Sequence, residues 1–187
     1  LIDVSKEVSD DLQTKLLLYR LRAKVDIIKT NISVSTGIDN PPIGAFKDPR
    51  HEALGWRSYE NSSINQGVDW KKLRVAYGIP ETNIELIRDK TYILEAGFEK
   101  LNGVDFKKGC YVGQEITARM KHKTTLRKGL IKVSVIGETP VGTEILADGR
   151  PAGVLYSQSG GYGLAFLKLD RASPKMKAGE ATVIIEN

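Results

Sequence analysis

The last third of the chain most narrowly limits the possible fold. From about residue 124, short apolar and β-branched runs alternate with turns that contain glycine. Short strands at regular spacing with glycine turns are typical of a small antiparallel barrel or sandwich. We therefore expect residues 124–187 to form a small antiparallel β-barrel. The runs that predict its strands are residues 130–136, 143–147, 153–156, 162–166 and 181–185.

Helical periodicity marks two segments of the first two thirds. Apolar residues that recur every three or four positions predict a helix over residues 7–23. A second helix is expected over residues 70–77, because Asp69 is a suitable N-cap and Gly78 a suitable stop. Its expected buried face carries Trp70, Leu73 and Tyr77.

Shorter segments complete the expected elements. β-branched runs at residues 25–28 and 32–34 predict two antiparallel strands, and residues 55–59 predict another. Further helices are expected over residues 93–101 and from Gly113 to about residue 122. This mixture predicts an α+β fold for the first part of the chain.

The two parts of the chain predict two domains. We expect an α+β domain over residues 1–123 and the barrel domain over residues 124–187. Residues 1–4 have the pattern of a strand already in progress. The α+β domain is therefore expected to lack an upstream segment and to expose an N-terminal strand edge.

Composition excludes several classes of protein. Of the 187 residues, 41% are hydrophobic and 27% are charged, which argues against a disordered chain. No apolar run is long enough to cross a membrane. One cysteine cannot form an internal disulfide or a multi-cysteine metal cage, and it favours a reducing compartment. The net charge of +5 favours acidic partners weakly.

The single cysteine lies in the stretch richest in chemical features. Cys110 follows two lysines and lies between Gly109 and Gly113, just before an expected helix start. Positive charge and backbone N–H groups at a helix start both stabilise a thiolate. Such a thiolate can serve as a nucleophile, a redox sensor or one ligand of a shared metal centre. The commoner state of a free cysteine is a small buried apolar residue, and spacing alone favours that alternative.

The same stretch resembles a known family. Lys108-Gly109-Cys110-Tyr111-Val112-Gly113-Gln114-Glu115 is similar to the K-G-C-[FY]-x-G-Q-E signature of the YgfZ family. These are folate-binding-fold proteins related to the T protein of the glycine cleavage system. Other segments resemble the family in its own order, at residues 19–25, 48–57, 74–81 and 102–106.

The resemblance implies a T-protein-like fold and a function. Family members are iron–sulfur protein maturation or repair factors, and their clients include radical enzymes that modify tRNA. Cys110 maps onto the family cysteine, which implies a cluster held jointly with an A-type iron–sulfur carrier protein. Tetrahydrofolate is the implied cofactor, with Arg74, Arg119 and Arg127 as expected cofactor-binding residues. The implied location is the cytoplasm in a bacterium and the mitochondrial matrix in a eukaryote.

Two departures from the family pattern weaken the enzymatic alternative. Many bacterial members and the T protein carry a glutamate that contacts the pterin, where this chain has Ala76. This places the chain closer to the mitochondrial and alphaproteobacterial branch. The catalytic aspartate of the T protein belongs to an upstream part that this chain does not show. A folate-dependent aminomethyl or one-carbon transferase is therefore the second hypothesis, behind a maturation factor that is not a classical enzyme.

A basic segment follows the cysteine motif. Residues 116–137 contain no Asp or Glu but hold six Lys and Arg, including Arg119 and Arg127. A solvated linker and a positive rim for an anionic ligand or acidic partner both fit this pattern. No aromatic stacking motif accompanies the charge, so direct nucleic-acid binding is not expected. Arg74 is open to a structural alternative, in which it braces a carboxylate, and Arg50 and Arg57 are expected to form ion pairs within the fold.

Overall fold

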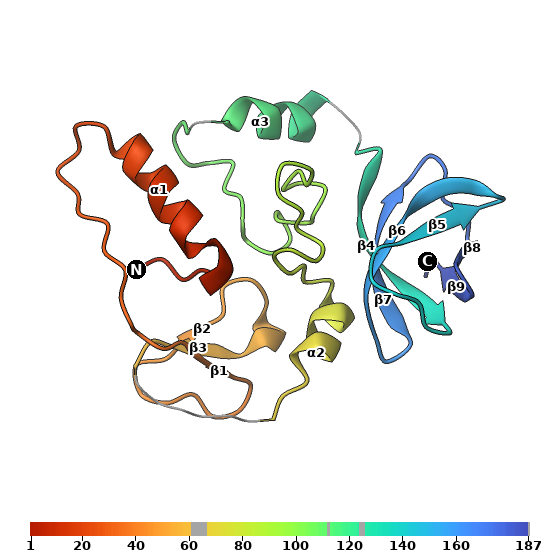
Figure 1. Cartoon of the computed structure of the whole chain (residues 1–187), viewed down its shortest axis with the longest axis horizontal. Coiled ribbons are helices and arrows are strands. Elements are labelled where there is room, and N and C mark those ends of the chain that lie inside the picture. Colours follow the sequence, from red (N-terminus) through yellow and green to blue (C-terminus); the bar gives the residue numbers. More distant parts are fainter. Residues whose placement is uncertain (61–66, 112, 124–125, 187) are drawn as a thin grey trace.

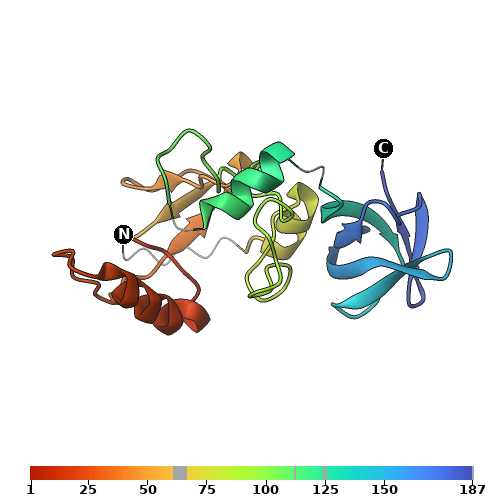
Figure 2. The same ribbon diagram turned by 90° about the horizontal axis from the view of Figure 1, so that it is seen from above.

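The computed structural model describes residues 1–60, 67–111, 113–123 and 126–186. Its barrel and its α1 helix lie at opposite ends of the molecule, with α2 and α3 between them (Figures 1 and 2). No helix in the described part of the chain is long and apolar enough to cross a membrane. The expected boundary after residue 123 falls next to residues 124 and 125, which lie outside the described residues, so it stays a prediction.

The C-terminal part is a closed antiparallel barrel, as the sequence predicts. Its strand order is β4-β7-β6-β5-β8-β9, and pairing of β4 with β9 closes the ring. The strand β8 was not predicted, because its two lysines interrupt a very short apolar pattern. The strands are β4 (Lys128–Ile136), β5 (Thr143–Ala147), β6 (Arg150–Ser159), β7 (Tyr162–Lys168), β8 (Lys175–Ala178) and β9 (Ala181–Ile184).

Side chains from all six strands fill the barrel. Alternate residues point inward, as along β4, where Val133 and Val135 are buried and Lys132 is exposed. Small residues are needed where strands approach closely. A Cβ atom on Gly153 would lie 2.3 Å from the carbonyl oxygen of Phe166 on the neighbouring strand β7, so this position requires glycine.

The N-terminal part combines helices with a small sheet. A 3₁₀ turn (Lys6–Val8) leads into α1 (Ser9–Arg20), and three antiparallel strands follow in the order β1-β3-β2. The sheet is short because each strand has only two or three residues. The strands are β1 (Ser35–Gly37), β2 (Phe46–Lys47) and β3 (Trp56–Ser58), with a 3₁₀ turn at Glu52–Leu54.

The helix α2 (Trp70–Tyr77) has the predicted ends. The Asp69 side chain accepts from the backbone N–H of Lys72 at 2.8 Å, and Gly78 adopts a left-handed conformation at the C-terminal end. The predicted buried face is wrong, because Tyr77 is exposed while Arg74 and Val75 are buried. The helix packs against β6 and β7 of the barrel, and this contact selects the buried face.

Three local predictions are wrong. Residues 25–34, all of them described, form no strand, because the two β-branched runs find no pairing partner there. Residues 1–4 form no strand either, and Asp3 instead pairs with Arg57. Residues 93–102 form consecutive turns in place of a helix, and Gly97 within them has φ +78°, which a helix does not tolerate.

Candidate functional site

Cys110 lies on the loop that leads into α3 (Gln114–Lys123). Two reciprocal hydrogen bonds fix the junction of loop and helix. The backbone N–H of Tyr111 donates to Gln114 Oε1 at 3.1 Å, and the backbone N–H of Gln114 donates to the Tyr111 carbonyl at 3.3 Å. Gln114 thus ties the start of α3 back to the residue that follows the cysteine.

The surroundings of the thiol are open and positively charged. Cys110 is exposed, so it is not the small buried residue that spacing alone favours. Lys107 and Lys108 are exposed beside it, and the Lys108 ammonium lies 4.8 Å from the centre of the Tyr111 ring. The roles of the motif residues Lys108, Gly109, Tyr111, Gly113, Gln114 and Glu115 stay predictions.

A group of side chains, which we call the Phe106 clasp, holds α3 against the preceding segment. The rings of Phe106 and His122 meet edge to face with centres 6.2 Å apart, and Lys121 lies 5.3 Å above the Phe106 ring. Lys121 also pairs with Glu99. Because these contacts connect the helix with the segment before Cys110, they restrict how the loop can move.

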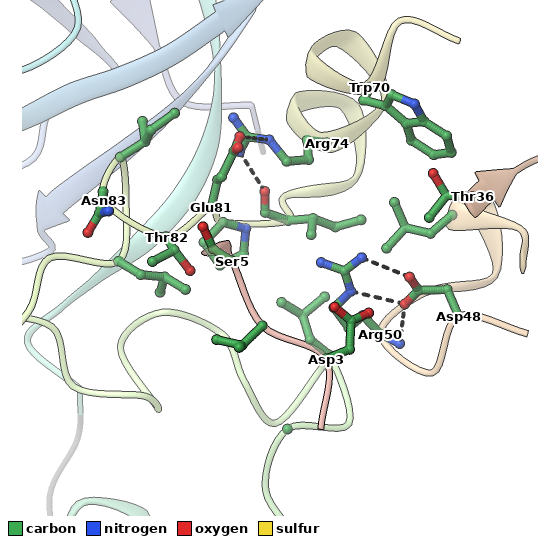
Figure 3. A pocket seen from close by; sticks show the side chains of 18 of the residues that line it. Asp3, Ser5, Thr36, Asp48, Arg50, Trp70, Arg74, Glu81, Thr82 and Asn83 are labelled. Atoms are coloured by element: carbon green, nitrogen blue, oxygen red, sulfur yellow. Dashed lines mark hydrogen bonds and ion pairs between the residues drawn. The ribbon is translucent and has the colours of Figure 1, made fainter. Parts of the chain in front are cut away.

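A larger cavity lies between α2, residues 79–86 and the N-terminal segment. It has a volume of about 760 Å³, and Asp48, Arg50 and Trp70 line it (Figure 3). We call it the Asp48 cavity. No described residue of α3 lines it.

The Asp48 carboxylate joins two arginines on the wall of this cavity. Arg50 donates to both of its oxygens, at 3.0 and 2.7 Å, and Arg57 donates to Oδ2 at 3.0 Å. Burial raises the pKa of Asp48, but hydrogen bonds from Arg50 and the charges of both arginines outweigh it and lower the pKa below its ordinary value. The expected ion pairs of Arg50 and Arg57 are therefore confirmed.

The three arginines expected to bind a cofactor lie apart. Arg74 donates to Glu85, to Ser157 and to the Ile79 carbonyl, and it also pairs with Glu81, so it braces carboxylates. Arg119 is exposed on α3 and lies outside the lining of the Asp48 cavity. Arg127 lines a different, smaller cavity. Their role in cofactor binding stays a prediction.

Sequence reasoning missed the partners of these arginines. Glu85 is almost completely buried and accepts from Arg74 and from the backbone of Ser157, which is 72 residues away in the chain. Contacts between such distant residues leave no local pattern. His51 has a local role, since its Nδ1 accepts from the backbone N–H of Ala53 at 3.1 Å and so caps the short 3₁₀ turn.

Comparison with known proteins identifies the barrel and a set of relatives. Residues 127–186 match the family model described as "CAF17, C-terminal beta-barrel domain". The mitochondrial iron–sulfur cluster assembly factor IBA57 of Homo sapiens is 31% identical over 198 residues, which cover 89% of this chain and 56% of the human protein. The IBA57 protein of Mus musculus is 28% identical over 200 residues, with 90% and 56% covered. The homologue from Mycosarcoma maydis is 29% identical over 153 residues, with 72% and 38% covered.

The matches cover most of this chain but only part of each relative. The chain spans about half the length of the human and mouse relatives it matches. The closed six-stranded barrel agrees with the domain described for residues 127–186. The chain therefore carries a CAF17-type C-terminal β-barrel, and the relatives it matches are IBA57 iron–sulfur cluster assembly factors.

Proposed function

We propose that this protein is an iron–sulfur cluster maturation factor that acts through Cys110. The observation that carries the proposal is the exposed Cys110 thiol on a fixed loop at the start of α3, beside Lys107 and Lys108. Kinship with proteins named as iron–sulfur cluster assembly factors supports the same function. In this role Cys110 loses its proton and ligates iron as a thiolate.

A shared cluster follows from the number of thiols. The chain has one cysteine, whereas the common iron–sulfur clusters are held by four. Further ligands must therefore come from another protein or a small thiol, and we propose an A-type iron–sulfur carrier as their source. The clients that receive the cluster are iron–sulfur enzymes, including radical enzymes that modify tRNA. The proposed location is the mitochondrial matrix in a eukaryote and the cytoplasm in a bacterium.

Anaerobic reconstitution tests this function. The chain, an A-type carrier, ferrous iron and sulfide are mixed, and visible absorption and circular dichroism follow the cluster. We expect a cluster signal that needs both proteins, and we expect its loss in Cys110→Ser. Lys100→Ala, an exposed change on the preceding turn, serves as the matched control and retains the signal. An undiminished signal with Cys110→Ser would contradict the proposed role.

We also propose that tetrahydrofolate binds this chain weakly or not at all. The Asp48 cavity is large enough for a small molecule. However, Ala76 offers no carboxylate to a pterin, and the donors of Arg74 are already used within the protein. Titration calorimetry is expected to show little heat with tetrahydrofolate. Binding tight enough to saturate at micromolar ligand would contradict this expectation.

A further inference from the structure

The smaller cavity lies where the turns at residues 93–102 meet the start of β4. It has a volume of about 500 Å³, and we call it the Glu95 cavity. The backbone N–H of Leu130 donates to the Glu95 carbonyl at 2.7 Å, so the turn is attached directly to the barrel. The cavity is well above the ~30 Å³ that one water occupies in the liquid and lies within the usual size range of small-molecule sites.

An incompletely satisfied carboxylate lies in the wall of this cavity. Glu95 is 6% exposed, and its Oε2 atom is buried without a hydrogen-bond partner. Lys128 forms an ion pair with that oxygen at 3.5 Å, but its ammonium is also 5.8 Å from each of the Tyr92 and Phe166 rings. A buried carboxylate oxygen normally accepts hydrogen bonds, so a ligand that donates N–H groups would complete this one.

Positive charge gathers around the same cavity. Lys128 and Lys168 face each other across the β4–β7 pair, and Arg127 precedes Lys128. Like charges directly opposite each other on neighbouring strands are destabilising, so an anionic group would relieve this arrangement. Within the described part of the chain, Arg127, Lys168 and Asp170 form no ion pair. Three charged groups around the cavity are therefore available to a ligand.

The Glu95 carboxylate favours a positively charged group in a ligand, and the surrounding Lys and Arg side chains favour a negatively charged one. We propose that the Glu95 cavity binds a small ligand that carries both a protonated amine and a carboxylate, an amino acid or a short peptide. Its ammonium group donates to Glu95, with Asp170 as a second acceptor, and its carboxylate binds Arg127 and Lys168. Met120 and Leu126 provide the apolar part of the lining. Hydrogen bonds between charged partners are the strong ones, so both ends of the ligand contribute.

Three related peptides test the proposal on the intact chain. Triglycine carries both charged ends, N-acetyl-triglycine lacks the ammonium group, and triglycinamide lacks the carboxylate. Ligand-observed NMR and titration calorimetry measure their binding. We expect triglycine to bind, and each blocked peptide to bind about tenfold more weakly or worse, the loss typical of one charge-assisted contact. Equal binding of all three peptides overturns the proposal. So does the absence of any binding at about 10 mM peptide, a concentration at which even weak ligands bind.

Two variants place the binding on Glu95. Glu95→Gln keeps the size of the side chain but removes its charge, so it should weaken triglycine binding about tenfold. Glu180→Gln, an exposed change on the turn between β8 and β9, is the matched control and should bind like the wild type. Unchanged binding by a folded Glu95→Gln variant overturns the proposal. If that variant does not fold, the blocked peptides on the wild-type chain decide the question.

Discussion

At the scale of single residues, Asp48 holds together the ion pairs in the wall of the Asp48 cavity. The side chain of Asp48 is 2% exposed, and it forms ion pairs with both Arg50 and Arg57. Arg57 also pairs with Asp3 near residue 1. The carboxylate of Asp48 is therefore part of a series of ion pairs that connects separate segments of the N-terminal part. Removing one member of a buried charged group leaves the others uncompensated, which costs far more than the loss of an exposed ion pair.

This contrast predicts a pH-dependent effect of Asp48→Asn. Because the folded pKa of Asp48 is lowered, its contribution to stability is present above the ordinary aspartate pKa and is lost as pH falls through the folded pKa. At pH 7 we expect a loss of about 3 kcal/mol in the free energy of unfolding. Below pH 3 the difference from wild type should shrink, because protonation neutralises the wild-type side chain too.

Urea denaturation at several pH values measures this difference. Asp89→Asn is the control, since Asp89 is 89% exposed and pairs with Arg88 at 3.5 Å, an arrangement worth at most about 1 kcal/mol. A stability difference for Asp48→Asn that stays the same from pH 7 to well below pH 3 would show that the Asp48 charge is not its source.

At the scale of elements, the sequence predicts those structures whose causes are local. The ends of α2 follow from Asp69 and Gly78, and the hairpin of β6 and β7 follows from Gly160 and Gly161 between two strand patterns. The loop of Cys110 also belongs to this class, because its lysines, glycines and helix start lie in one stretch. The place of Cys110 on a loop before a helix start was therefore predictable from neighbouring residues, whereas spacing alone favoured a buried thiol.

Other elements depend on contacts that a local pattern does not contain. The β-branched residues at 25–34 favour strands, yet strands need partners, and none forms there. The buried face of α2 is chosen by the barrel, so Arg74 is inside and Tyr77 is exposed. The Asp48 cavity joins residues 3, 48, 57 and 74, whose proximity arises only from the tertiary fold. The helix α1 has an apolar pattern but no buried residue. Its sequence therefore predicted the helix but not the exposure of its side chains.

At the scale of the whole molecule, one buried polar network joins the barrel to the part of the chain before it. Glu85 is 1% exposed and lies between the two. Its Oε2 atom accepts from Arg74 at 3.1 Å and from the Glu81 backbone at 2.9 Å, and its Oε1 atom accepts from the backbone N–H of Ser157 on β6 at 3.2 Å. Arg74 also donates to the Ser157 hydroxyl at 2.8 Å. The barrel has a continuous hydrophobic core of its own, and this network connects it to the preceding part.

Glu85→Leu is therefore expected to uncouple the two parts. It removes the buried one of the two carboxylates that pair with Arg74 and leaves only the half-exposed Glu81, which should destabilise the preceding part by about 3 kcal/mol. Both tryptophans, Trp56 and Trp70, lie in that part, so tryptophan fluorescence reports its unfolding alone.

Amide NMR signals of the barrel report the unfolding of the barrel. Comparison of the two urea midpoints then shows whether the two parts of the chain unfold separately or together. In the wild type we expect coincident midpoints, and in Glu85→Leu the fluorescence midpoint should fall while the barrel midpoint stays. Glu144→Gln, an exposed change on β5, is the control and should leave both midpoints together. Loss of both signals at the same lower urea concentration would contradict this expectation. It would mean that the barrel is not stable without the network and that the two parts unfold as one cooperative unit.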